Sequence, residues 1–334
     1  MKIKFSERPS NANENVVIVT KEEKKMVTHH KEVFERLLKE IHKVIIGQDE
    51  MIEQVMTALL CNSNALLEGY PGLAKTLVIN TIAKAVDLKF SRIQNTPDLM
   101  PSDITGTYII TEERGKREFK FQEGPLFSNI VLADEINRAT PKSQSAFLEA
   151  MQEKQVTVGN QTFKLEEPFF VLATQNPIEQ EGTYPLPEAQ ADRFLMKINV
   201  DYPTEEEEIE IVKKFTEKAD VKEVHKILDK ARLLKLQDLT RQMPIANDLR
   251  KAAVKIVIAT RKNKELFMYG ASPRASMALI LASKARALIN GRAHVSSEDI
   301  RKMALPVLRH RVILSFEAER QGLSVDDAIA KIMK

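Results

Sequence analysis

The sequence predicts an α/β domain, with a parallel sheet sandwiched by helices, followed by a smaller, all-helical domain. Short apolar runs alternate with helical patterns in the first part of the chain, which is typical of a buried parallel sheet. After Tyr202 and Pro203 the pattern is helical with no convincing strand. The length of 334 residues also exceeds one average domain. The expected strands cover residues 65–67, 130–133, 169–173 and 195–198.

The chain begins with a polar stretch that reads as a flexible or loosely attached tail. Apolar residues at helical spacing then predict a helix over residues 33–46, which Gly47 ends, and Asp49 opens the next helix. Further along, Thr140 and Pro141 predict the start of another helix. The resulting division is a tail, an α/β domain and a helical domain, at residues 1–27, 28–203 and 204–334.

Two stretches interrupt the alternation of strands and helices, and we expect both to form β-hairpins. Residues 108–122 hold a charged turn between two alternating segments. Residues 156–163 carry Gly159 and Asn160 at the turn. We interpret both hairpins as insertions in the α/β layout.

Two capping boxes predict helix starts in the C-terminal domain, Thr204 with Glu207 and Ser296 with Asp299. The four glutamates at residues 205–208 are interpreted as a solvated first helical turn and not as metal ligands. The first of these boxes places the domain boundary near residue 203.

The composition is that of an ordinary globular protein, with 43% hydrophobic and 29% charged residues. The net charge of +3 gives no sign of the clustered basic face of a dedicated nucleic-acid binder. The one cysteine, Cys61, is expected to be a buried, inert thiol in a reducing compartment. No apolar run has the length of a signal-peptide core or of a membrane span, so we expect a cytoplasmic protein with no transmembrane segment.

A glycine-rich segment follows the first predicted strand and opens a helix, which is the context of a phosphate-binding loop. Such a loop needs backbone N–H groups aimed at the β- and γ-phosphates, a lysine, and a hydroxyl that holds Mg²⁺. Gly69 and Gly72 supply the tight backbone path, while Lys75 and Thr76 supply the charge and the hydroxyl. Ala74 stands where a glycine is usual, and we expect it to be tolerated with a negative φ, as part of the helix.

Asp134 and Glu135 follow directly after the second predicted strand. Carboxylates at the carboxyl end of a strand lie at the ligand edge of an open α/β sheet. Asp134 can hold the Mg²⁺ shell, and Glu135 can orient or deprotonate the attacking water. The pair alone would equally suit a helix start, but its combination with the loop favours a site.

Three polar residues, Thr174, Gln175 and Asn176, follow the third predicted strand. A polar side chain at this place could reach the γ-phosphate or the water. Asn176 with Pro177 is also a good turn signal, so the residues alone leave both interpretations open.

The histidines show no metal-ligand spacing with a second donor, so no zinc site is expected. The basic cluster of Arg309, His310 and Arg311 is given a surface or an inter-subunit role.

Taken in order, these motifs resemble the MoxR-type branch of the AAA+ ATPases. The resemblance extends from about residue 46 to the end of the chain. Alanine at the position of Ala74 is frequent in this branch. The segments that carry the resemblance are residues 46–48, 69–76, 134–139, 173–177, 188–194 and 271–275.

The resemblance implies roles that spacing does not give. Lys75 and Thr76 look like Walker A, and Asp134 and Glu135 look like Walker B, with Thr76 and Asp134 holding Mg²⁺. Asn176 looks like sensor 1. The residues that the resemblance places around the nucleotide are Ile46, Gly47, Gln48, Gly69, Tyr70, Pro71, Gly72, Leu73, Ala74, Lys75, Thr76 and Leu77.

Two arginines acquire functions through the same resemblance. Arg193 is similar to the arginine finger that reaches the nucleotide of a neighbouring subunit, where a guanidinium can clamp transition-state charge. Arg274 is similar to sensor 2 on a helical lid, acting in cis or in trans. Without the family, a surface ion pair for Arg193 and a helix cap for Arg274 would be the simpler interpretations.

The resemblance implies an ATPase that works with Mg²⁺ in a homo-oligomeric ring, usually a hexamer, and remodels or matures protein partners. Proteins with von Willebrand factor A domains are frequent partners in this branch. One alternative is a nucleic-acid motor that grips DNA with Lys116, Arg117 and Lys164, although nearby glutamates and the low net charge oppose it. The other is a nucleotide-gated interaction protein, which Glu135 beside Asp134 opposes.

Overall fold

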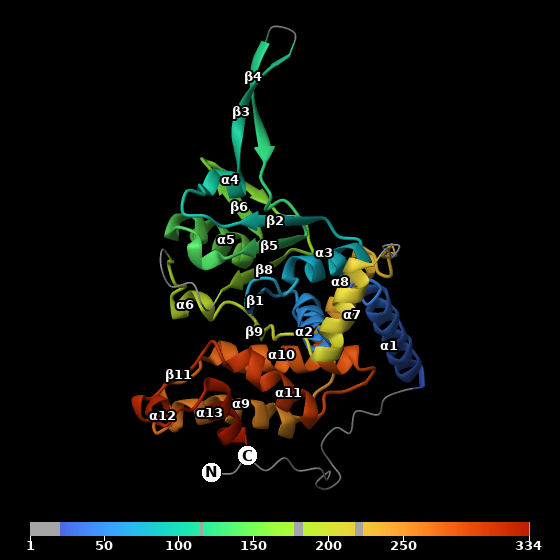
Figure 1. The fold of residues 1–334 in the computed structure, drawn as a ribbon, viewed down its shortest axis with the longest axis vertical. Helices are drawn as coiled ribbons and strands as arrows, with labels where there is room; N and C mark the ends of the chain where they lie inside the picture. Colours follow the sequence, from blue (N-terminus) through green and yellow to red (C-terminus); the bar gives the residue numbers. More distant parts are fainter. Residues whose placement is uncertain (1–20, 114–115, 177–182, 218–222, 334) are drawn as a thin grey trace.

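The computed structural model describes residues 21–113, 116–176, 183–217 and 223–333. It shows the expected sheet with helices, two hairpins and a helical C-terminal region (Figure 1). Residues 1–20 of the predicted tail, the hairpin-tip residues Arg114 and Gly115, and Pro177 of the turn signal lie outside the described residues. The division at residue 203 stays a prediction.

The centre of the fold is a five-stranded sheet in the order β2-β5-β8-β1-β9, and each neighbouring pair is parallel. The predicted parallel sheet is therefore confirmed. The four expected strands are β1 (Ala65–Glu68), β5 (Ile130–Asp134), β8 (Phe170–Gln175) and β9 (Met196–Asn199). The edge strand β2 (Phe90–Gln94), in which Ile93 is the one buried residue of five, was not predicted.

Successive side chains of a strand point to opposite faces of the sheet, and in the central strands both sets are apolar. Helices therefore cover both faces. Leu67, Leu132 and Leu172 face the helices α1 (Lys21–Ile41), α2 (Asp49–Leu60) and α3 (Lys75–Ala85). Val131 and Val171 face α4 (Pro101–Thr105) and α5 (Pro141–Glu153). Helix α5 begins after Thr140, as expected, and α1 begins at Lys21, within the segment that was expected to be a tail.

Both hairpins are present. The first, β3 (Gly106–Glu113) with β4 (Lys116–Glu123), projects far from the sheet (Figure 1). The second, β6 (Gln155–Val158) with β7 (Gln161–Lys164), packs against its base. There the ring of Phe121 stacks on that of Phe163 with centroids 4.2 Å apart, and the Tyr108 hydroxyl donates a 2.6 Å hydrogen bond to Gln161. The two insertions therefore contact each other.

The C-terminal region is helical, and both predicted capping boxes are formed, at Thr204 with Glu207 and at Ser296 with Asp299. A two-stranded antiparallel ladder was not expected, since β10 (Phe267–Tyr269) and β11 (Ile313–Leu314) are too short to show an alternating pattern. The helices are α7 (Glu205–Thr216), α8 (Lys230–Gln242), α9 (Asn247–Lys262), α10 (Pro273–Ile289), α11 (Ser297–Leu308), α12 (Phe316–Arg320) and α13 (Val325–Met333).

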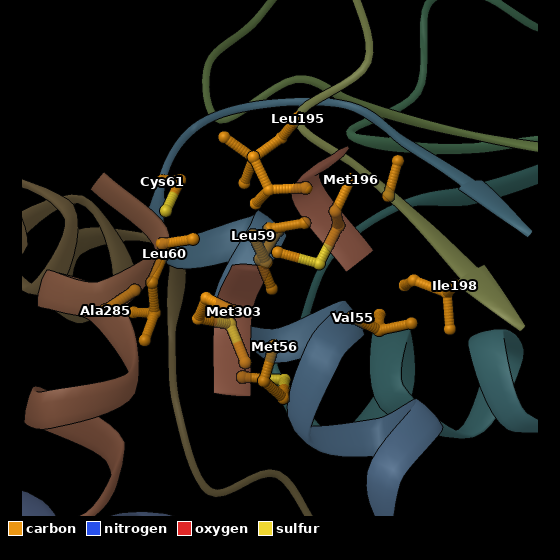
Figure 2. Close-up of a cluster of buried hydrophobic side chains, with 14 of the residues drawn as sticks. Val55, Met56, Leu59, Leu60, Cys61, Leu195, Met196, Ile198, Ala285 and Met303 are labelled. Atoms are coloured by element: carbon orange, nitrogen blue, oxygen red, sulfur yellow. The ribbon is translucent and has the colours of Figure 1, made fainter. Parts of the chain in front are cut away.

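Helices α10 and α11 share one hydrophobic core with the sheet domain. Figure 2 shows Ala285 of α10 and Met303 of α11 beside Leu59 of α2 and Met196 of β9. Cys61 is buried near the same cluster, and this burial raises the pKa of its thiol, as an inert cysteine requires. Within the described ranges, no helix is long and apolar enough to cross a bilayer.

Candidate functional site

The glycine-rich loop connects β1 to α3, and its glycines are needed where the backbone is tight. A Cβ on Gly69 would lie 2.8 Å from the Val200 carbonyl oxygen, and Gly72 has a φ of 85°. Ala74 also lies in the left-handed region, with a φ of 54°. The expectation of a negative φ was wrong, because Ala74 is the residue before the helix and the chain turns there. An alanine in this conformation costs about 1–2 kcal/mol.

Lys75 is the first residue of α3, and its ammonium group folds back over the loop. It donates hydrogen bonds of 2.7 and 2.8 Å to the carbonyl oxygens of Gly69 and Tyr70. Burial lowers the pKa of Lys75, while the negative charges of Asp134 and Glu135 act to raise it. The loop lysine and both acids therefore lie within electrostatic reach of one another.

Both acids are held by Thr174, a buried residue of β8. The Thr174 hydroxyl donates a 2.6 Å hydrogen bond to Oδ1 of Asp134 and accepts one of 2.8 Å from the backbone N–H of Glu135. Glu135 has a left-handed backbone with a φ of 54°, which directs the chain away from the end of β5. Thr174 therefore belongs to the site as well as to the strand end.

The Glu135 carboxylate has two further partners. Its Oε2 accepts hydrogen bonds of 3.1 Å from Nη1 of Arg138 and from Nε2 of Gln94. Another β2 residue, Arg92, donates to the Asp134 carboxylate. Neither Arg92 nor Gln94 was predicted as a site residue, because the strand that carries them, β2, was not predicted. The alternation of polar residues around the buried Ile93 was the available signal.

Asn176 directly follows β8 and is nearly buried, at the same edge of the sheet as Asp134. Beside it, the Gly69 N–H donates a 3.4 Å hydrogen bond to the Gln175 carbonyl oxygen, which ties the loop to the end of β8. The structure therefore brings Asn176 to the edge that carries the loop and the acids.

The segment that follows β9 contacts both the loop and the residues 46–48. Gln48 donates a 3.1 Å hydrogen bond to the Asp201 carbonyl oxygen. Gly47, with a φ of 63°, leaves room for the Glu207 carboxylate, which a Cβ there would strike. From the other side, the Tyr70 ring stacks on Tyr202 with centroids 5.3 Å apart. The loop and residues 46–48 therefore contact the same segment, the one that follows β9.

Arg193 and Arg274 do not join this edge. Together they line a cavity of about 440 Å³ with residues 62–64 and Leu195. These lining residues stand at the amino ends of β1 and β9, whereas the loop leaves the carboxyl end of β1. The four residues of β1 span roughly 13 Å. The two arginines are therefore together, at the edge of the sheet opposite the chain's own loop.

Asp192 connects these arginines to the helical region. Its carboxylate accepts hydrogen bonds from Nε of Arg311 at 2.8 Å and from the Ser272 hydroxyl at 2.9 Å. It also lies 3.6 Å from Nη1 of Arg274. The Arg311 side chain is only 2% exposed and contacts residues 192–195 inside the chain. The surface role given to the basic cluster at residues 309–311 was therefore wrong for Arg311, and an inter-subunit role stays a prediction.

The residues expected to hold Mg²⁺ suit that ion. Magnesium takes oxygen ligands, usually one or two from the protein with the rest from phosphates and water. Asp134 offers a carboxylate at the ligand edge, and Thr76 offers a hydroxyl next to Lys75, whose pKa responds to Asp134. In the described part of the chain, no group of three His, Cys, Asp or Glu side chains gathers as a metal cage. A site completed by phosphates does not need such a cage.

A loop between a parallel strand and a helix, with paired acids two strands away, defines a P-loop nucleotide-binding protein. Comparison with known proteins gives the family. Residues 64–196 match the ATPase family associated with various cellular activities (AAA), and residues 258–332 match the AAA lid domain. The chain belongs to the MoxR-type AAA+ ATPases.

Individual relatives agree with this assignment. The chain is 45% identical to Chaperone MoxR1 of Mycobacterium tuberculosis over 90% of this chain and 81% of that protein. It is 29% identical to Protein MoxR of Paracoccus denitrificans over 87% of this chain and 93% of that one. A crystal structure of a putative ATPase from Cytophaga hutchinsonii superposes with a TM-score of 0.86 at 43% identity, covering 94% of this chain and 97% of that one.

Proposed function

We propose that this protein hydrolyses ATP with Mg²⁺ in a homo-oligomeric ring, and that it uses the energy to remodel or mature protein partners. The observation that carries the proposal is the division of the site between two edges of the sheet. Lys75, Asp134 and Glu135 gather at one edge, and Arg193 with Arg274 at the other.

The residues at the loop edge bind the nucleotide and prepare the water. Lys75 leaves the carbonyl oxygens of its own loop to neutralise phosphate charge, and Thr76 with Asp134 holds Mg²⁺, which would draw charge from the phosphate oxygens. Glu135 orients the attacking water and accepts its proton. Asn176 is placed to contact the γ-phosphate or that water. These roles are proposals that the shared location of the residues supports.

The residues at the other edge serve a neighbouring subunit. A guanidinium that reaches the transferring phosphate is worth on the order of a thousandfold or more in rate in other NTPases. Arg193 and Arg274 are separated from their own loop by the length of β1. In a ring with head-to-tail interfaces, the same arginines face the loop of the next subunit. We therefore assign both to action in trans, with a hexamer as the expected ring.

The proposed partner is a protein. One relative carries the name Chaperone MoxR1, and the long hairpin offers exposed apolar side chains, Ile110 and Phe119, opposite each other on one face. A partner with a von Willebrand factor A domain stays a prediction from the family, and so does the cytoplasmic location.

A nucleic-acid motor is less consistent with the hairpin. Arg117, which would grip DNA, lies 3.3 Å from the Glu112 carboxylate across the two strands. This acid offsets the charge that phosphate contacts need. Tight DNA binding with a steep dependence on salt would favour the motor over our proposal.

Subunit mixing tests the ring and the roles together. Lys75→Ala and Arg193→Ala are each expected to abolish hydrolysis, with Lys75→Ala also losing nucleotide binding. When the two variants are mixed in equal amounts, about a quarter of the interfaces pair an intact loop with an intact arginine, so phosphate release should return.

The matched control mixes Lys75→Ala with Glu135→Gln. Both changes lie at the loop edge, so no interface is intact and no activity should return. Recovery in this control, or full activity of isolated wild-type subunits, would contradict the proposal. Equal, slow phosphate release by wild type and Glu135→Gln rings would instead favour a nucleotide-gated interaction protein without hydrolysis.

A further inference from the structure

Arg92 contacts the proposed Mg²⁺ ligand Asp134, and the proposed chemistry gives this contact no role. Its guanidinium donates two hydrogen bonds to Oδ2 of Asp134, from Nε at 3.0 Å and from Nη2 at 2.6 Å. The other oxygen, Oδ1, accepts from Thr174. Both oxygens of the Asp134 carboxylate therefore have partners within the chain.

These partners differ in what they allow. The Thr174 hydroxyl is neutral and leaves Oδ2 open, but Arg92 places a positive charge on that oxygen. A carboxylate that serves Mg²⁺ offers its oxygen to the cation or to a water bound to it. A guanidinium on the same oxygen occupies its lone pairs and repels a second cation. Arg92 and the metal cannot both hold Oδ2 in this arrangement.

The structure also provides a place for the guanidinium when it leaves. Nη2 of Arg92 donates a 2.7 Å hydrogen bond to the Gln94 side chain, which lies on the same face of β2. The Arg92 side chain is 47% exposed, so it is not fixed by packing, while the Asp134 side chain is 13% exposed. Release of Asp134 would thus leave Arg92 with a neutral partner and with water.

We propose that Arg92 competes with Mg²⁺ for Asp134, so that metal binds at this site only when the guanidinium moves away. The inference rests on the proposed function, since it concerns the same metal site. It makes Arg92 a regulatory residue that acts through Asp134, and it assigns the edge strand β2 a part in controlling when the ATPase is loaded.

The test measures metal binding directly, with Mn²⁺ as the probe. The full chain is titrated with Mn²⁺ in the presence of ADP, and electron paramagnetic resonance measures the concentration of free Mn²⁺. Removing a partly exposed charge pair should lower the Mn²⁺ dissociation constant about three- to tenfold in Arg92→Ala. Arg92→Gln should give the same direction, and it serves if the alanine variant does not fold. Arg92→Lys keeps the charge without the two-point contact, so its Mn²⁺ dissociation constant should lie between those of the wild type and Arg92→Ala.

Arg117→Ala is the matched control, because it removes an arginine from an exposed pair with Glu112 and should leave Mn²⁺ binding unchanged. Weaker or unchanged Mn²⁺ binding in folded Arg92→Ala and Arg92→Gln would overturn the inference, the first because Arg92 would then orient Asp134 for the metal. ADP-dependent Mn²⁺ binding by the wild type is the separate test of the proposed function. If neither the wild type nor the Arg92 variants bind Mn²⁺ with ADP, the proposed function is refuted together with the competition.

Discussion

The Arg311 guanidinium donates a 2.8 Å hydrogen bond to the Asp192 carboxylate, directly next in the chain to Arg193. Arg311 also donates to the carbonyl oxygens of Leu195 and Phe194, so this one side chain holds the segment that leads into β9. Asp192 in turn binds Ser272 and Arg274. The same buried cation therefore holds the carboxylate that contacts Arg274 and the backbone on both sides of Arg193.

Replacing Arg311 should strongly destabilise the fold. Arg311→Met removes the buried cationic partner of a largely buried carboxylate and takes one hydrogen-bond donor from several carbonyl oxygens. Breaking such a pair typically costs about 3–5 kcal/mol. Urea unfolding followed by circular dichroism measures the loss. Arg232→Met, on the exposed surface of α8, should change the stability by less than about 0.5 kcal/mol. Equal effects of the two changes would contradict the role of the buried contact.

Ala74→Gly should stabilise the protein, because a glycine adopts a φ of 54° without the Cβ penalty. The greater freedom of glycine in the unfolded chain offsets part of this gain, so we expect an increase of about 0.5–1 kcal/mol in the free energy of unfolding. Ala330→Gly, in the interior of α13, should lower it by about 1 kcal/mol. Equal losses in both variants, measured in the same urea series, would show that Ala74 is unstrained.

Thr174→Val should reduce hydrolysis more than nucleotide binding. Valine has the shape of threonine but loses the hydroxyl that contacts both Asp134 and Glu135. Loss of such a supporting contact typically costs about 10- to 100-fold in activity. Steady-state phosphate release gives kcat, and titration with a fluorescent ADP gives the affinity. Thr174→Ser keeps the hydroxyl and should restore most of kcat. A rate defect of the same size in the serine variant would point to the methyl group instead.

Lys154 predicts a dependence of stability on pH. Burial lowers its pKa to about 8, and its ammonium group donates to the Phe169 carbonyl oxygen at 2.8 Å. In the unfolded chain the pKa returns to about 10.4. Between these values the unfolded chain is protonated and the folded one is not, so the free energy of unfolding rises with pH.

Lys154→Met removes this titration. The stability of the wild type relative to the variant should rise by at most about 1 kcal/mol per pH unit between pH 8 and 10. Urea unfolding at several pH values, with both proteins in the same buffers, gives this difference. A constant difference across the window would mean that Lys154 keeps an ordinary pKa in the folded protein.

Much of the sheet could be predicted because its central strands are continuous apolar runs. The strand β5 is buried in four of five positions and ends in the two acids, so pattern and chemistry point to the same place. The edge strand β2 is buried on one position only and lacks that pattern. Arg92 and Gln94 lie on β2 and were therefore not predicted as site residues. Their contacts with Asp134 and Glu135 join residues about 40 positions apart in the chain.

Backbone conformation and long-range packing also could not be predicted from the sequence. The φ of Ala74 depends on how the loop enters α3, which no local preference of alanine reveals. The burial of Arg311 depends on residues 192–195, just before β9 and more than 100 residues earlier in the chain. A basic side chain is usually exposed, so the sequence around Arg311 does not indicate that it is buried against Asp192 and several carbonyl oxygens.

The apolar contact of α10 and α11 with α2 and β9 determines which parts of the protein can move. Separating the helical region from the sheet would expose Leu59, Met196 and Met303, each of which gains roughly 1.5–3 kcal/mol from burial. A hinge at this seam would have to overcome that cost in every cycle. We expect the sheet and the helical region to move together as one rigid unit, so that in the proposed ring a nucleotide-driven motion is a rotation at the interfaces between protomers.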